Sequence, residues 1–190
     1  MKNYNHKLFW DDLNSKSILG KIYQKYFLFP ILLKNIKGEL IDIGAGLGDF
    51  CKLYKKSVAA DINKLAVENY KLRNIKGVLI KNNKIDIQDS YFDTSIMDNV
   101  IEHIENPEGI LNEIKRILKN NGRLIIGVPG VKGFNNDFDH KVFYDQKSLT
   151  HLMSNFNFEL EKVFHTPFKN NWLNNNLKAY TVYCVYNNIK

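Results

Sequence analysis

From residue 38 onward, short apolar and β-branched runs alternate with segments in which apolar residues recur every three or four positions. The runs predict strands and the spaced pattern predicts helices. Strands are expected at 39–43, 57–60, 77–80, 94–98, 122–128, 158–165 and 178–186. Helices are expected at 47–55, 63–73, 107–119 and 148–156, with Asn121-Gly122 as the stop signal of the third. Such alternation is typical of an α/β fold, a parallel sheet with helices on both faces.

Residues 1–37 precede this pattern and form a helical segment of their own, because apolar residues follow helical spacing from Ile18 to Tyr26 and Pro30 then interrupts or restarts the helix. Three interpretations are open. The segment packs on the edge of the sheet, or it forms a lid with Trp10 or Tyr4 lining a pocket, or its apolar stretch attaches to a surface. We therefore divide a single compact domain into a cap or lid at 1–37 and an α/β unit at 38–190.

Two stretches of the C-terminal third read as long loops. Residues 130–144 are rich in Gly, Asn and aromatic residues, and residues 166–177 are rich in Asn. Loops of this length are usually functional or disordered.

The segment Leu-Ile-Asp-Ile-Gly-Ala-Gly-Leu-Gly at 40–48 carries the strongest chemical signal. An apolar strand ends in three glycines at alternate positions, with Asp42 two residues before the first, and a helix follows. Glycines at such a turn let the backbone approach an adenosine-bearing ligand, although a turn that only needs flexible residues would look similar. The dinucleotide fingerprint G-x-G-x-x-G fits poorly, because Asp49 stands where its third glycine belongs and would repel a pyrophosphate.

A second acidic residue, Asp61, ends the next apolar run, nineteen residues beyond Asp42. An acidic side chain at this spacing, at the tip of the second strand of a βαβ unit, accepts the hydroxyls of a ribose. Asp61 or Asn63 can also cap the following helix, so both roles can coexist.

A third segment, residues 92–129, contains Phe-Asp near its start, Ile-Glu-His-Ile near a strand end, and a turn Leu-Lys-x-x-Gly-x-Leu-x-Ile into a further strand. Together with the first two segments it resembles the class I S-adenosylmethionine-dependent methyltransferases over residues 40–129. The resemblance implies a Rossmann-like, seven-stranded, mostly parallel sheet with helices on both faces and an antiparallel C-terminal hairpin. It also implies S-adenosyl-L-methionine as the cofactor.

The resemblance implies a cofactor site at the carboxyl ends of the strands. Asp61 would hold the ribose, Ile62 would offer an apolar face to adenine, and Asn82 or Asn83 would meet the adenine edge. The residues expected to bind the cofactor are Asp42, Gly44, Ala45, Gly46, Gly48, Asp61, Ile62, Asn82, Asn83 and Asp98.

Three residues are candidates for catalysis. His140 lies among carboxylates and aromatics after the fifth strand and is the preferred base, the alternative being a polar surface histidine. His103 titrates in a useful range, but the family's Glu-His pair is often structural. Asp98 would hold the ligand's ammonium or orient a substrate, or would cap the next helical turn.

Composition excludes several classes. The two cysteines, Cys51 and Cys184, lie far apart without metal-ligand spacing, so we expect small buried thiols, no disulfide and no metal. The net charge of +7 comes almost entirely from dispersed lysines, which argues against a nucleic-acid partner. No apolar stretch is long enough to span a membrane, and no signal core opens the chain, so a cytoplasmic location is expected.

The compact core implies a small-molecule acceptor. The resemblance then implies methyl transfer to a small polar acceptor, most plausibly a sugar or nucleotide-sugar hydroxyl. Two alternatives remain: N-methylation of a small amine, and a non-catalytic binding module that keeps the methyltransferase fold.

Overall fold

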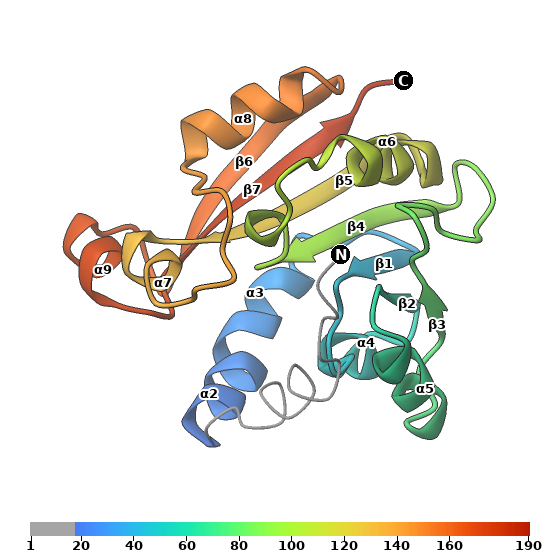
Figure 1. Cartoon of the computed structure of the whole chain (residues 1–190), viewed down its shortest axis with the longest axis horizontal. Coiled ribbons are helices and arrows are strands. Elements are labelled where there is room, and N and C mark those ends of the chain that lie inside the picture. The colour runs from blue at the N-terminus through green and yellow to red at the C-terminus, as the bar shows by residue number, and fades with distance from the viewer. Residues whose placement is uncertain (1–17) are drawn as a thin grey trace.

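The computed structural model describes residues 18–190 and contains one seven-stranded sheet, in the order β3-β2-β1-β4-β5-β7-β6 (Figure 1). Strands β1 to β5 pair in parallel, and β7 runs antiparallel to both β5 and β6. This confirms the predicted fold class, including the antiparallel C-terminal hairpin. The strands are β1 (Leu40–Ile43), β2 (Ser57–Asp61), β3 (Gly77–Leu79), β4 (Phe92–Asp98), β5 (Leu118–Pro129), β6 (Phe158–Thr166) and β7 (Thr181–Asn188).

Helices lie between the strands where the alternating pattern predicted them. They are α4 (Asp49–Leu53), α5 (Lys64–Leu72), α6 (Glu108–Ile117) and α8 (Gln146–Ser154), with short elements η2 (Ile101–His103), α7 (Val131–Phe134) and α9 (Asn171–Asn176). The two predicted long loops thus each contain a short helix, and the backbone N–H of Val131 joins them by donating to Asn174 Oδ1 at 3.2 Å.

The predicted end of the third helix is wrong. Helix α6 ends at Ile117, before Asn121-Gly122, because Leu118 is already extended and pairs with Phe92 of β4. A strand pairing with a distant segment therefore ends the helix, and the local stop signal does not.

The sheet is covered on both faces, as the strand pattern shows. Ile41 and Met97 belong to the core beneath α6 and α8, whereas their neighbours Leu40 and Ile96 belong to the core beneath α3 and α4. Adjacent residues of a strand point to opposite faces, so these two clusters lie on either side of the sheet. Both cysteines are buried free thiols, as expected.

The N-terminal helical segment consists of α2 (Ile18–Tyr23), a π-helical turn η1 (Gln24–Leu28) and α3 (Phe29–Leu33). Leu28, Phe29 and Leu32 are buried against the sheet, which favours the interpretation that this part packs on it. Pro30 stands in the first turn of α3 and restarts the helix. The lid candidates Tyr4 and Trp10 lie outside the described residues. Within residues 18–190, no helix has the length and apolar character needed to cross a membrane.

Candidate functional site

The glycine turn between β1 and α4 forms the centre of the site. Gly44, Gly46 and Gly48 have φ values of +71°, +54° and +71°, a region that favours glycine. A Cβ on Gly44 would lie 2.5 Å from the side chain of Val100, which follows β4. The turn is therefore held tightly against the end of β4, with Gly46 and Gly48 buried and Gly44 and Ala45 partly accessible.

Asp61 ties the end of β2 to this turn. Its Oδ2 accepts a hydrogen bond from the Gly46 N–H at 3.0 Å, and its Oδ1 accepts one from the Asn63 N–H at 2.8 Å. Asn63 caps α5 by accepting from the Leu65 N–H at 2.9 Å. The capping role thus belongs to Asn63, and the buried Asp61 carboxylate is held against the glycine turn.

Ile62 follows Asp61 and is 73% exposed, which is unusual for a large apolar side chain beside a buried strand end. This exposure fits the predicted apolar face for an adenine ring.

The Asp42 carboxyl has a strongly raised pKa. It is buried at the end of β1, and burial, together with the negative charges of Asp98 and Asp61, raises its pKa to about 8. The Cys51 thiol donates to Asp42 Oδ2 at 3.8 Å and compensates it only weakly. A cationic ligand at this point would stabilise the ionised carboxylate.

Asp98 ends β4 and is oriented by the C-terminal hairpin. The Tyr183 hydroxyl of β7 donates to Asp98 Oδ1 at 2.7 Å, and the Asn99 side-chain amide donates to the same oxygen at 3.0 Å. Tyr183 itself is buried. Sequence reasoning missed Tyr183, because only strand order brings β7 beside this residue.

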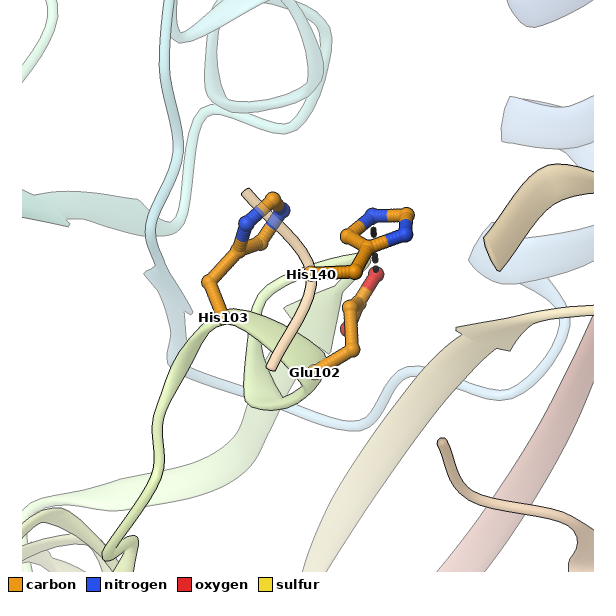
Figure 2. Close-up of side chains that lie close together, drawn as sticks. All are labelled: Glu102, His103 and His140. Atoms are coloured by element: carbon orange, nitrogen blue, oxygen red, sulfur yellow. Dashed lines mark ion pairs between the residues drawn. The ribbon is translucent and has the colours of Figure 1, made fainter. Parts of the chain in front are cut away.

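Glu102, His103 and His140 come together beyond β4, although the two histidines lie far apart in sequence (Figure 2). The Glu102 carbonyl accepts from the backbone N–H groups of Lys141 at 2.7 Å and Val142 at 3.1 Å, which fixes the loop that carries His140. The two imidazole rings lie 4.7 Å apart between centroids. The structure thus joins two predicted catalytic residues in one cluster.

Glu102 was not among the predicted site residues, yet it is the fully buried member of this cluster. Neither carboxylate oxygen has a hydrogen-bond partner, and burial, with the charges of Asp98 and Asp137, raises its pKa to about 8. The sequence signal for this residue was the polar Glu102-His103 pair between the apolar Ile101 and Ile104.

Asn82 and Asn83 lie at the tip of an exposed two-residue turn, with φ values of +50° and +59°. Backbone hydrogen bonds between Lys81 and Lys84 close the turn. A Cβ on Gly109 would lie 2.5 Å from the Asn83 amide, so that side chain covers the start of α6. Contact of either asparagine with adenine stays a prediction.

A cavity of about 150 Å³ opens at the same edge of the sheet, at the ends of β5 and β6. Its lining includes Gly130, Tyr144, His165 and Tyr180, and the Tyr180 hydroxyl lies 2.8 Å from His165 Nδ1. Burial and the charge of Glu102 raise the pKa of Tyr144.

Comparisons with known proteins agree with this architecture. Residues 41–126 match the model of a methyltransferase domain family. An uncharacterised protein of Methanocaldococcus jannaschii is 30% identical over 139 residues, which cover 70% of this chain and 66% of that protein. A ubiquinone/menaquinone biosynthesis C-methyltransferase of Paraburkholderia phymatum is 27% identical over 130 residues, covering 60% of this chain and 54% of the relative. The chain thus spans less than two thirds of the length of these curated relatives.

A solved structure supports the same assignment at the level of the fold. The S-adenosylmethionine-dependent methyltransferase of Thermotoga maritima superposes with a TM-score of 0.75 at 20% identity, covering 96% of this chain and 99% of the other. The family-model match includes the glycine turn, Asp61 and the end of β4, the three features from which the site is built. Over residues 41–126 the chain thus carries a methyltransferase domain, in the fold of the S-adenosylmethionine-dependent methyltransferases.

Proposed function

We propose that this protein transfers a methyl group from S-adenosylmethionine to a small polar acceptor. The observation that carries the proposal is the acidic cradle at the ends of β1 and β2, where Asp61 is anchored to the glycine turn and Asp42 is buried without strong compensation. S-adenosylmethionine carries a sulfonium, an ammonium and a ribose, so its positive charges and its hydroxyls match these carboxylates.

Each residue at these strand ends would contact a different part of the cofactor. Asp61 would accept the ribose hydroxyls, and Ile62 would pack on the adenine. The backbone of the glycine turn would lie along the amino-acid part, between Asp42 and Asp98. When bound, the cofactor supplies an electrophilic methyl on a good leaving group, so the protein must mainly align the acceptor and exclude water.

A hydroxylated acceptor fits the other half of the site. In O-methylation the acceptor oxygen loses a proton and forms a bond to the methyl carbon, while the carbon–sulfur bond breaks and its electrons stay on sulfur. Glu102, His103 and His140 would supply the polar groups for such an oxygen, and Phe134 links them to the cavity because it packs on both His140 and the lining residue Phe143. Sugars and nucleotide-sugars are acceptors of this chemical class.

The test is calorimetric titration of the purified protein with S-adenosylhomocysteine, beside NAD as a competing adenosine ligand. We expect binding of S-adenosylhomocysteine alone, weakened in Asp61→Ala by about 1.5–3 kcal/mol, the scale of hydrogen bonds to a charged group. Glu68→Gln on the exposed face of α5 is the matched control and should bind like wild type.

Two results would count against the proposal. If wild type bound neither ligand, the protein would be a non-catalytic module of the same fold. If it bound NAD preferentially, the glycine turn would serve a dinucleotide. Incubation of the binding-competent protein with methyl-labelled cofactor and panels of sugars, nucleotide-sugars and small amines would then identify the acceptor class.

A further inference from the structure

The cluster of Glu102, His103 and His140 has the composition of a metal site. One ligand atom from each residue lies within 4.8 Å of the others. Two imidazoles and one carboxylate form a common donor set for Zn²⁺ and for other first-row divalent ions. In Figure 2 the Glu102 carboxylate and the His140 ring point toward one another.

The hydrogen bonding of His140 fixes which of its nitrogens is available. Its Nδ1 lies 2.9 Å from the Phe134 carbonyl, an acceptor, so Nδ1 carries the proton and donates it. In the neutral ring, Nε2 then keeps a lone pair, and this atom lies 3.9 Å from Glu102 Oε1. Metal-bound histidines usually show this arrangement, with the second nitrogen donating to a carbonyl or carboxylate.

Glu102 provides an independent observation. Its side chain is fully buried, is aimed at the two histidines, and has no hydrogen-bond partner on either oxygen. A bound cation would stabilise the ionised form of a carboxylate in such a position. The neutral His140 ring presents its Nε2 lone pair to this carboxylate at 3.9 Å.

The distances suit one ion between these groups. Atoms bound to Zn²⁺ at about 2.0–2.2 Å in tetrahedral geometry lie about 3.4 Å from one another. The Glu102–His140 separation of 3.9 Å is already close to this value, and the widest separation in the cluster, at most 4.8 Å, needs to shorten by up to about 1.4 Å. His103 is 32% exposed at the side chain and can make this movement.

Nearby acidic residues add to the favourable field. The Asp139 carboxylate lies 3.3 Å from His103 Nδ1, and the Asp137 carboxylate lies 3.8 Å from His140 Nε2. The cluster therefore combines a buried ligand, two imidazoles and an anionic surround.

We propose that Glu102, His103 and His140 bind one divalent transition-metal ion, of which Zn²⁺ is the simplest. Three protein ligands leave at least one coordination position open. This inference rests on the proposed function. The acceptor's hydroxyl oxygen would bind at the open position, and the ion would lower the pKa of that hydroxyl, whose proton passes to solvent. His140 is then a metal ligand, where the sequence predicted a base and no metal.

The experiment uses the full chain, stripped with a chelator and dialysed. It is titrated with Zn²⁺ in the calorimeter and with Co²⁺ by visible absorption, neither of which depends on turnover. We expect one ion per chain. Glu102→Gln and His140→Gln should each weaken binding by more than about 100-fold, because even outer-shell partners are worth 10–100-fold.

Exposed residues of the same types supply matched controls: Glu105→Gln and His151→Gln should bind the ion like wild type. Thermal unfolding without metal checks that each variant folds. The partly exposed His103→Gln serves as a third variant if a buried change fails this check, and it should also lose the ion. Zn²⁺ should raise the unfolding temperature of wild type and leave that of Glu102→Gln unchanged.

The proposal is overturned if wild type binds no ion, or if the three cluster variants bind it as tightly as the controls do. S-adenosylhomocysteine titrated into the same metal-free protein separates the two proposals. Retained S-adenosylhomocysteine binding with no metal binding would remove the metal site and leave the proposed function standing.

Discussion

Replacing Asp42 with Asn tests how a buried acid controls cofactor binding. Because burial and the charges of Asp98 and Asp61 raise the pKa of Asp42 to about 8, most molecules hold this carboxyl protonated at neutral pH. If a positively charged cofactor binds only to the ionised form, its affinity must rise with pH. The Asp42 carboxyl is ionised in about one molecule in a hundred at pH 6 and in about one in eleven at pH 7. The affinity for the cofactor should therefore rise about tenfold between pH 6 and pH 7, which is about 1.4 kcal/mol of binding free energy.

The same shift has a consequence for stability. The folded protein keeps a proton that the unfolded chain releases near its ordinary pKa of 3.8, so unfolding releases a proton and stability falls as pH rises from about 4 to about 8. Asp42→Asn should therefore raise the free energy of unfolding at pH 7 by up to about 4 kcal/mol. It should also weaken cofactor binding and remove its dependence on pH.

Calorimetry with S-adenosylmethionine, in the absence of any acceptor, at pH 6.0, 6.5 and 7.0, together with urea unfolding, measures both effects. Glu68→Gln changes an exposed carboxylate and should reproduce the wild-type slope. The reasoning would be refuted if affinity for wild type were constant between pH 6 and 7, or if Asp42→Asn were no more stable than wild type.

Two further predictions concern the frame around the site. Gly44→Ala combines a φ of +71° with a Cβ 2.5 Å from Val100, and should cost about 1–3 kcal/mol in urea unfolding; an unchanged midpoint would contradict the packing described. Hydrogen bonds from Arg116 lower the pKa of the buried Glu113 to about 2. The ionised carboxylate therefore adds about 3 kcal/mol to the free energy of unfolding above pH 4.5, and this contribution is lost as the pH falls toward 2. Glu113→Gln should thus be less stable than wild type at pH 7, with a smaller difference at pH 3, and an equal difference at both would refute this assignment.

The first half of the sheet could be predicted from sequence because its signals are local. Apolar run, glycine turn and helix follow one another directly between Leu40 and Leu53, and the spacing to Asp61 reflects a single βαβ unit. Asp61 and Asn63 were both candidates for the cap of α5. Asn63 is the cap, because the Asp61 carboxylate accepts a hydrogen bond from the glycine turn.

The errors arise where distant segments meet. The end of α6 depends on pairing between Leu118 and Phe92, which no local stop signal reveals. The role of Tyr183 depends on β7 lying beside β5, and the isolation of Glu102 depends on a loop that begins about thirty residues further along. His103 and His140 were recognised singly, but only the fold shows that they share one buried carboxylate.

The most direct test of the account is a crystal structure of the protein with S-adenosylhomocysteine. We predict that the ribose hydroxyls lie within hydrogen-bond distance of the Asp61 carboxylate, that the adenine packs on Ile62, and that the amino-acid part follows the backbone of Gly44 to Gly46. A ligand bound elsewhere, or a glycine turn that stays empty at saturating ligand, would contradict the assignment of this cradle as the cofactor site.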